Sequence, residues 1–225
     1  LMLHSCSFGA YVPVDISGDF LNDQSHELRK DFPNLAVYPV TADFTKPFAL
    51  PPEVVHMPKV GFFPGSTIGN FDPHEACAFL RSARAILGDG AAMIVGVDLE
   101  KDEQVLRSAY NDADGVTGKF NSNVLVRINR ELGGNFDLSS FVHRAIYNRE
   151  RHRIEMHLIS KKAQTVRLLG HSFAFRAGET IHTESSYKYS VDRFMALARG
   201  SGWSPQEIWT DPDQMFSVYA LIAED

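Results

Sequence analysis

The sequence predicts an α/β protein, and three observations support this fold class. Short apolar runs alternate with helix-like stretches over the first 98 residues, a pattern typical of strand–helix–strand crossovers in a mostly parallel sheet. The run 91–97 is almost entirely apolar, as expected for a strand that is covered on both faces. The tail, 190–225, returns to the same alternation after a middle part of different character.

The predicted elements of the first part follow one another closely along the chain. They are a strand over 11–15, a helix over 18–31, strands over 35–40 and 59–63, a helix over 73–87 and a strand over 91–97. The helix over 73–87 has a complete start signal, because Asp72 can cap it, Pro73 suits its first position and Glu75 lies three residues after the cap.

The middle of the chain reads as an α+β insertion. Residues 99–135 are polar with helical spacing, and from Val142 the pattern becomes the alternation of half-exposed strands. The predicted strands there cover 153–159, 164–169 and 181–189; the tail then has a helix over 190–200 and strands near 207–209 and 216–222. We therefore predict an α/β core of 1–98 plus 190–225, interrupted by an α+β insertion of 99–189.

Composition excludes several classes of protein. The net charge of −6 gives no electropositive surface for nucleic acid, and no apolar stretch approaches the 18 residues of a membrane span. Two cysteines are too few for a disulfide scaffold, and no pair of histidines has metal-ligand spacing with a carboxylate. We expect a cytoplasmic protein without a metal site, nucleic-acid partner or membrane contact.

Acidic residues follow two of the predicted strands, where parallel sheets bind ligands. Asp15 could accept hydrogen bonds from ribose hydroxyls, or it could cap the helix that follows. Asp43 could accept from an exocyclic amine while Phe44 packs on a purine, or the pair could be a turn acid beside a core ring. The residues alone leave both alternatives open.

Two further places could contact a ligand. The loop 65–70 puts glycines and polar side chains after a predicted central strand, although a plain tight turn has the same composition. Glu184 and Ser186 lie two apart on one strand, hence on one face, whereas Met156 and His157 lie on opposite faces of another. A carboxylate beside a hydroxyl can hold both nitrogens of an imidazole, but an exposed polar strand face looks the same.

Taken in order, these segments resemble the histidine-specific methyltransferase family of the ergothioneine pathway. The resemblance covers essentially the whole chain, and its most specific parts are the Gly-Ser-Thr-Ile-Gly-Asn loop and the segment around Tyr110. The matching segments are 12–17, 42–44, 63–71, 96–99, 109–117, 129–132, 153–158 and 183–186.

The resemblance implies a Rossmann-like enzyme that uses S-adenosylmethionine (SAM) to methylate the α-amine of free L-histidine three times, giving hercynine. It places the cofactor against Asp15, Ile16, Asp43 and Phe44. It places the substrate against Gly65, Asn70, Tyr110, Met156, Glu184, Ser185 and Ser186. Asn70 would orient the amine and Tyr110 would bind the carboxylate, while Glu184 and Ser186 would bind the imidazole.

The chain departs from the family pattern in one respect. The family has a first strand with a Gly-rich cofactor loop and an N-terminal helical segment that contributes a tyrosine, and neither is found in this sequence. We therefore expect the chain to be part of a longer protein, with 1–9 as the end of the helix after that strand. Alone, it should pair the strands ending at Asp15 and Phe63 directly or borrow a strand from a partner, and it should bind SAM poorly and show no methyl transfer.

Three other functions stay open at this point. A family member could methylate another amino acid or amine, or the chain could be a non-catalytic binding remnant without the cofactor loop. A nicotinamide-dependent oxidoreductase also ends its first strands in acids, but the fingerprint glycines of that class are missing.

Overall fold

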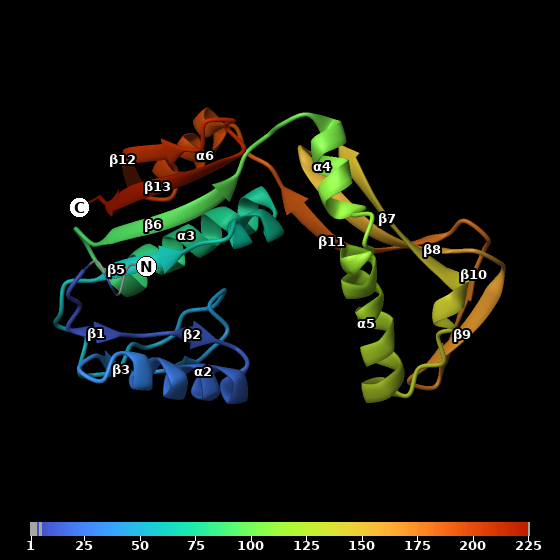
Figure 1. Cartoon of the computed structure of the whole chain (residues 1–225), viewed down its shortest axis with the longest axis horizontal. Coiled ribbons are helices and arrows are strands. Elements are labelled where there is room, and N and C mark those ends of the chain that lie inside the picture. Colours follow the sequence, from blue (N-terminus) through green and yellow to red (C-terminus); the bar gives the residue numbers. More distant parts are fainter. Residues whose placement is uncertain (1–3, 5, 225) are drawn as a thin grey trace.

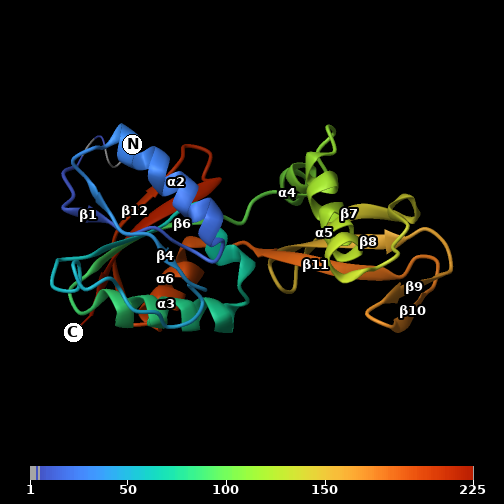
Figure 2. The ribbon, with the colours of Figure 1, turned by 90° about the horizontal axis from the view of Figure 1, so that it is seen from below.

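The computed structural model describes residues 4 and 6–224, which form two lobes joined by a narrow connection (Figure 1, Figure 2). Of the helix end expected over 1–9, residues 1–3 and 5 lie outside the described residues, and 6–9 are not helical. The boundaries predicted for the core and the insertion stay a prediction, although both lobes are visible in the figures.

The larger lobe is built on a four-stranded sheet in the order β12–β13–β6–β5. β5 (Val60–Phe63) runs parallel to β6 (Ala92–Asp98), whereas β13 (Phe216–Ala223) is antiparallel to both β6 and β12 (Trp203–Thr210). β12 therefore runs in the same direction as β5 and β6, and the prediction of a mostly parallel sheet is wrong only for β13. β12 and β13 form a hairpin, because their connection is far too short for a crossover helix.

Burial in this lobe centres on β6 and the helices beside it. Val95 and Val97 of β6 are fully buried, which confirms the prediction of a covered strand. α3 (Pro73–Leu87) begins with the predicted capping box of Asp72 and Glu75, and α6 (Val191–Arg199) is capped by Ser190. Both helices lie against the same face of the sheet (Figure 2) and share its core.

A separate pair of broken parallel strands precedes this sheet. β1 (Ala10–Tyr11) pairs with β3 (Ala36–Val37), β2 (Val14–Asp15) pairs with β4 (Val40–Thr41), and α2 (Gly18–Asp31) connects them. The predicted strands over 11–15 and 35–40 are each split in two. Pro13 and Pro39 stand at the breaks, and proline lacks the amide hydrogen that a ladder needs.

The two flanking strands do not join each other. Within the described part of the chain β5 pairs only with β6, and β2 pairs only with β4. Of the two outcomes expected for these strands, direct pairing is therefore wrong.

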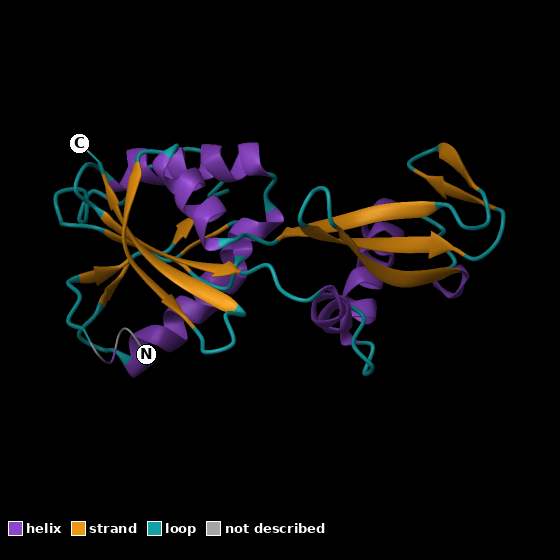
Figure 3. Ribbon diagram, turned by 90° about the horizontal axis from the view of Figure 1, so that it is seen from above, coloured by secondary structure: helices purple, strands orange, loops and turns teal. Residues whose placement is uncertain are grey.

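The smaller lobe is a three-stranded antiparallel sheet with helices on one face (Figure 3). The sheet has the order β11–β8–β7, and a hairpin of β9 and β10 extends from its end. The elements are α4 (Glu103–Tyr110), α5 (Val116–Leu132), β7 (Phe141–Asn148), β8 (Arg153–Ser160), β9 (Gln164–Leu168), β10 (His171–Phe175) and β11 (Thr180–Tyr187). A short 3-10 turn, η2 (Leu138–Ser140), lies between α5 and β7, and another, η1 (Thr67–Asn70), follows β5 in the larger lobe.

The predicted strands over 153–159, 164–169 and 181–189 match β8, β9 and β11, whereas β10 was not predicted and the helical stretch 99–135 is two helices, α4 and α5. Leu106 of α4 and Leu125 of α5 are buried against the sheet, together with Ile154, Met156 and Leu158 of β8. No helix in the described ranges has the length and apolar character needed to cross a bilayer.

The chain crosses between the lobes twice, and the two crossings touch. It leaves the larger lobe at Leu99 and returns at Tyr189, and these residues form a parallel bridge. The Tyr189 amide donates to the Asp98 carbonyl at 3.2 Å, and the Glu100 amide donates to the Tyr189 carbonyl at 3.0 Å. The ends of β6 and β11 are thereby held together.

Candidate functional site

The loop after β5 lies at the junction of the lobes. Gly65 and Ser66 have φ of 73° and 56°, a left-handed turn that sends the chain into η1. The Ser66 hydroxyl accepts from the Asp98 amide at 2.8 Å, so the loop is attached to the end of β6. A Cβ on Gly69 would lie 2.7 Å from the Tyr187 carbonyl oxygen, so only glycine lets the loop approach β11 this closely.

This approach creates a cavity of about 370 Å³ between the lobes. Asn70, Asp72 and Glu75 line it from the larger lobe. The facing wall comes from β8 and β11: Arg153, residues 182–185 and Tyr187. Of the predicted substrate residues, Asn70, Glu184 and Ser185 therefore border one space.

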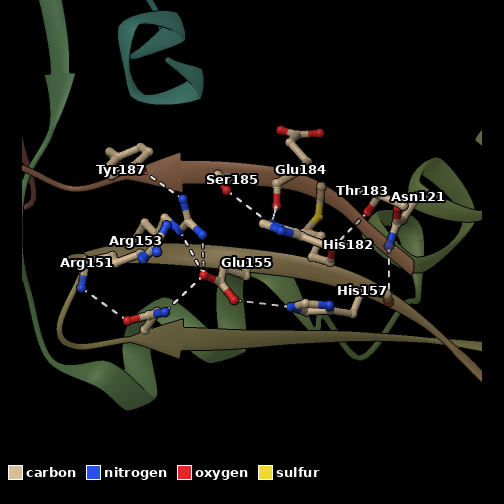
Figure 4. Close-up of polar contacts among 12 residues, drawn as sticks. Asn121, Arg151, Arg153, Glu155, His157, His182, Thr183, Glu184, Ser185 and Tyr187 are labelled. Carbon is tan, nitrogen blue, oxygen red and sulfur yellow. Dashed lines mark hydrogen bonds and ion pairs between the residues drawn. The ribbon is translucent and has the colours of Figure 1, made fainter. Parts of the chain in front are cut away.

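Glu184 lies on β11 opposite Met156 of β8, which places both on one face of the sheet as predicted. Met156 is buried in a cluster with Ala145 and Ile154, and the ring of Tyr110 packs against it. Burial raises the pKa of Glu184, and the nearby Lys188 ammonium opposes that shift. Figure 4 shows the Glu184 side chain directed away from its own strand, and none of the described residues forms a hydrogen bond with its carboxylate.

Tyr110 and Ser186 meet behind this wall. The Tyr110 hydroxyl donates to the Ser186 hydroxyl at 2.9 Å, although 76 residues separate them in the chain. Lys188, only 1% exposed, donates to both oxygens at 2.9 and 2.8 Å and pairs with Asp98 at 2.7 Å. Neither Lys188 nor Asp98 is among the residues that sequence reasoning singled out. The sequence pattern that could have indicated Lys188 is its spacing of two residues from Ser186, which is the spacing of side chains on one face of a strand.

The predicted cofactor residues lie at the carboxyl ends of the short parallel strands. Asp15 Oδ1 accepts from the Ser17 amide at 2.7 Å, so the acid does shape the start of α2. Ile16 is 71% exposed. β2 and β4 are neighbours, and hence Asp15 and the turn that follows β4 share one edge.

Asp43 and Phe44 occupy that turn. Hydrogen bonds from Thr45 and Lys46 lower the pKa of Asp43 to about 2. The ring of Phe44 contacts Phe63 and Phe79, with centroids 5.7 and 6.1 Å apart, and is only partly buried. The structure therefore shows a turn acid beside a partly buried core ring.

A second polar cluster covers the other face of the small sheet (Figure 4). Glu155 accepts from Arg153 at 2.6 Å and from His157 at 3.3 Å, and the ring of His157 stacks on His182. Burial raises the pKa of Glu155, but hydrogen bonds from Arg153, Asn148 and His157 outweigh it and lower the pKa to about 2.

Glu155, His157 and His182 bring their ligand atoms within 4.8 Å of one another, a grouping that could hold a metal ion. Sequence reasoning missed it, because His157 and His182 meet only through the register of β8 and β11. Arg153 already neutralises the carboxylate, and the histidine rings stack face to face, so the cluster is held together without an ion.

A larger cavity of about 630 Å³ lies beside α4. Arg107, Arg144 and Arg149 line it together with Asp102 and Glu103. None of the predicted site residues borders it. The chemistry of the candidate site is therefore confined to the junction of the lobes.

Comparison with known proteins gives a consistent result. The pattern of the histidine-specific, SAM-dependent methyltransferase family matches residues 1–223. Histidine N-alpha-methyltransferase of Mycolicibacterium smegmatis is 36% identical over 94% of this chain and 66% of its own length. The protein of that name from Mycobacterium tuberculosis is 34% identical over 92% of this chain and 65% of its own length.

The fold comparison agrees with the sequence comparison. A SAM-dependent methyltransferase from Clostridium acetobutylicum superposes with a TM-score of 0.51 at 10% identity, covering 95% of this chain and 75% of that one. The Rossmann-like methyltransferase fold predicted from the sequence is thus confirmed. The chain spans just under two thirds of the length of the curated relatives it matches. By the match over nearly its whole length, it belongs to the family of histidine-specific, SAM-dependent methyltransferases.

Proposed function

We propose that the protein transfers methyl groups from SAM to the α-amine of free L-histidine, three times in succession, to give hercynine. The observation that supports this most directly is the cavity where Asn70 and Glu184 face each other from different lobes. An amide on one wall suits the amino acid head, and a half-buried carboxylate on the other suits a ring N–H. The names of the relatives point to the same substrate.

The residues at the strand ends fit the cofactor in chemistry. Asp15 uses only one carboxylate oxygen within the described residues, so the other is free to accept from a ribose hydroxyl. Asp43 and Phe44 would contact the adenine, the first as an acceptor and the second through its partly exposed ring. When bound, SAM supplies the electrophilic methyl group.

The task of the protein's own residues is to present a neutral amine in line with that methyl group. An α-amino group titrates near 7.7–8.0 in model peptides, so the deprotonated form must be selected or generated. Asn70 would accept from the amine through its side-chain oxygen. The Tyr110 hydroxyl donates to Ser186 at 2.9 Å, so it would hold Ser186 for the imidazole rather than donate to the carboxylate. We assign no general base, and water can take the proton.

Substrate choice would rest on Glu184 and its neighbours. Met156 lies beside Glu184 on the same face of the sheet, since the two are cross-strand partners. Ser185 borders the cavity, and Ser186 lies behind it next to Tyr110. Glu184 and Ser186 together would bind both nitrogens of the imidazole, and a substrate without such a ring would leave the Glu184 carboxylate unpaired.

The test is methylation of histidine by the full-length protein, followed by mass spectrometry. We expect products with one, two and three added methyl groups. Glu184→Ala should weaken histidine binding about tenfold to a hundredfold, since a charge-assisted hydrogen bond is lost, and leave SAM binding unchanged. The control is Glu150→Ala on the exposed β7–β8 turn.

The competing assignments predict different results in the same assay. Methylation of another amino acid or amine, with histidine unchanged, would reassign the substrate within the family. Absence of SAM binding by calorimetry in the full-length protein would indicate a binding remnant instead.

A further inference from the structure

Lys188 is a buried cation whose three ammonium hydrogens all have hydrogen-bond partners. Its side chain is 1% exposed. Its ammonium group has three hydrogens, and it reaches three oxygens: Asp98 Oδ2 at 2.7 Å, the Tyr110 hydroxyl at 2.9 Å and the Ser186 hydroxyl at 2.8 Å. It also lies 4.8 Å from the centroid of the Tyr110 ring.

The hydrogen count has a consequence for the two hydroxyls. Tyr110 and Ser186 each accept one hydrogen from Lys188, and one of their own two hydrogens is used in the bond between them. One hydroxyl hydrogen remains without an acceptor in the described part of the chain. The pair therefore has one hydrogen-bond donor to offer, and Lys188 imposes that polarity.

Lys188 also connects the two lobes. Tyr110 ends α4 and Ser186 belongs to β11, both in the smaller lobe, whereas Asp98 ends β6 in the larger one. Asp98 is shared with Lys101, whose ammonium lies 2.6 Å from Oδ1. Lys101 thus neutralises the same carboxylate, and no hydrogen bond joins it to either hydroxyl within the described residues.

We propose that Lys188 is a positioning residue for the substrate: it holds the Tyr110 and Ser186 hydroxyls together, directs their remaining hydrogen to the ligand and fixes both to the larger lobe through Asp98. The proposal rests on the function proposed above. Beside the acceptor Glu184, a donor pair selects a ligand with one donor and one acceptor, as in an uncharged imidazole. Lys188 contacts no substrate atom in this role, because its three hydrogens are already used.

The experiment measures histidine and SAM affinity of the full-length protein by calorimetry, with steady-state kinetics for both. Lys188→Met keeps the length of the side chain and removes the charge, and Lys101→Met is the matched control at the other oxygen of Asp98. We expect Lys188→Met to weaken histidine binding on the order of tenfold to a hundredfold, as loss of charged hydrogen bonds does, with SAM binding kept. Lys101→Met should bind histidine as the parent does.

A double-mutant cycle tests whether Lys188 acts through Ser186. On a Ser186→Ala background, Lys188→Met should cost less than threefold in histidine affinity. Equal costs on both backgrounds, or an unchanged affinity in the single variant, would overturn the proposal. If Lys188→Met does not fold, Lys188→Gln, which keeps a donor in the same space, serves in the cycle, and its SAM affinity reports an intact larger lobe.

Histidine binding by the parent protein distinguishes a failure of this proposal from a failure of the proposed function. A parent that binds and methylates histidine, with a Lys188→Met variant indistinguishable from it, refutes only the role of Lys188. A parent that does not bind histidine refutes the substrate assignment, and the role of Lys188 falls with it.

Discussion

The closeness of η1 and β11 makes Gly69→Ala a sharp test of how the site is assembled. The added methyl group would lie 2.7 Å from the Tyr187 carbonyl oxygen and 3.6 Å from the Tyr187 amide nitrogen. Both atoms belong to the backbone, so no change of rotamer relieves the clash. The loop with Asn70 must move away from the strand with Glu184 and Ser186, and the cavity between them must widen.

Overpacking of this kind typically costs about 1–3 kcal/mol. For a chain of 225 residues this lowers the melting temperature by roughly 2–12 °C. The catalytic effect should be larger, because a misplacement of about 1 Å can reduce turnover on the order of a hundredfold. Differential scanning calorimetry and single-turnover methylation measure the two effects separately.

Gly118→Ala is the matched control, since it adds the same methyl group elsewhere. Its Cβ would lie 3.5 Å from His143 Cβ, an ordinary contact, and position 118 is inside α5. Position 118 is in the first turn of the helix, so the replacement of glycine should stabilise the protein by at most about 0.5–1 kcal/mol. A Gly69→Ala protein with parental melting temperature and turnover would refute the assembly of the site described above.

Three other outcomes follow from single contacts. Trp203→Phe removes a fully buried indole whose Nε1–H donates to the Leu80 carbonyl at 2.8 Å. Urea unfolding should show a free energy of unfolding that is lower by about 1–3 kcal/mol. An unchanged unfolding midpoint would contradict this expectation. Glu155→Gln should destabilise the protein near neutral pH but not in acid. A carboxyl whose pKa is lowered from 4.5 to about 2 contributes stability above pH 4.5, and this contribution is lost as the pH falls toward 2. Parallel pH–stability curves for parent and variant would argue against this role of Glu155. Asp43→Asn keeps the side-chain oxygen that accepts from the Thr45 amide but loses the negative charge. Calorimetry should show about tenfold weaker SAM binding with histidine binding intact. Equal SAM affinity would mean that Asp43 only shapes the turn.

Features set by neighbours in the sequence could be predicted. The capping box of α3 needs only Asp72 and Glu75, and the caps of α6 need only Ser190 and Gly200, so both helices begin and end where expected. The common face of Glu184 and Ser186 follows from the two-residue period of a strand. The antiparallel hairpin at the end was not foreseen, because the alternation of strands and helices does not encode direction.

Features set by long-range register could not be predicted. The contact of Tyr110 with Ser186 depends on how α4 packs on β7 and β8, which brings the end of the helix to β11. Lys188 reads as one polar residue between two tyrosines until the fold places Asp98 beside it. A family resemblance suggested that Tyr110 and Ser186 serve one substrate, but it did not reveal the cation that joins them.

The bridge between Leu99 and Tyr189 has a mechanical consequence. Because the two crossing segments are hydrogen-bonded to each other, they bend and twist as one ribbon, and the lobes cannot move apart along it without breaking that bridge. A ribbon of this kind permits rocking about its own axis and resists stretching. Asn70 and Glu184 lie on opposite sides of the cavity beside it, so a small rocking angle changes the width of the cavity mouth while the ends of β6 and β11 stay in register.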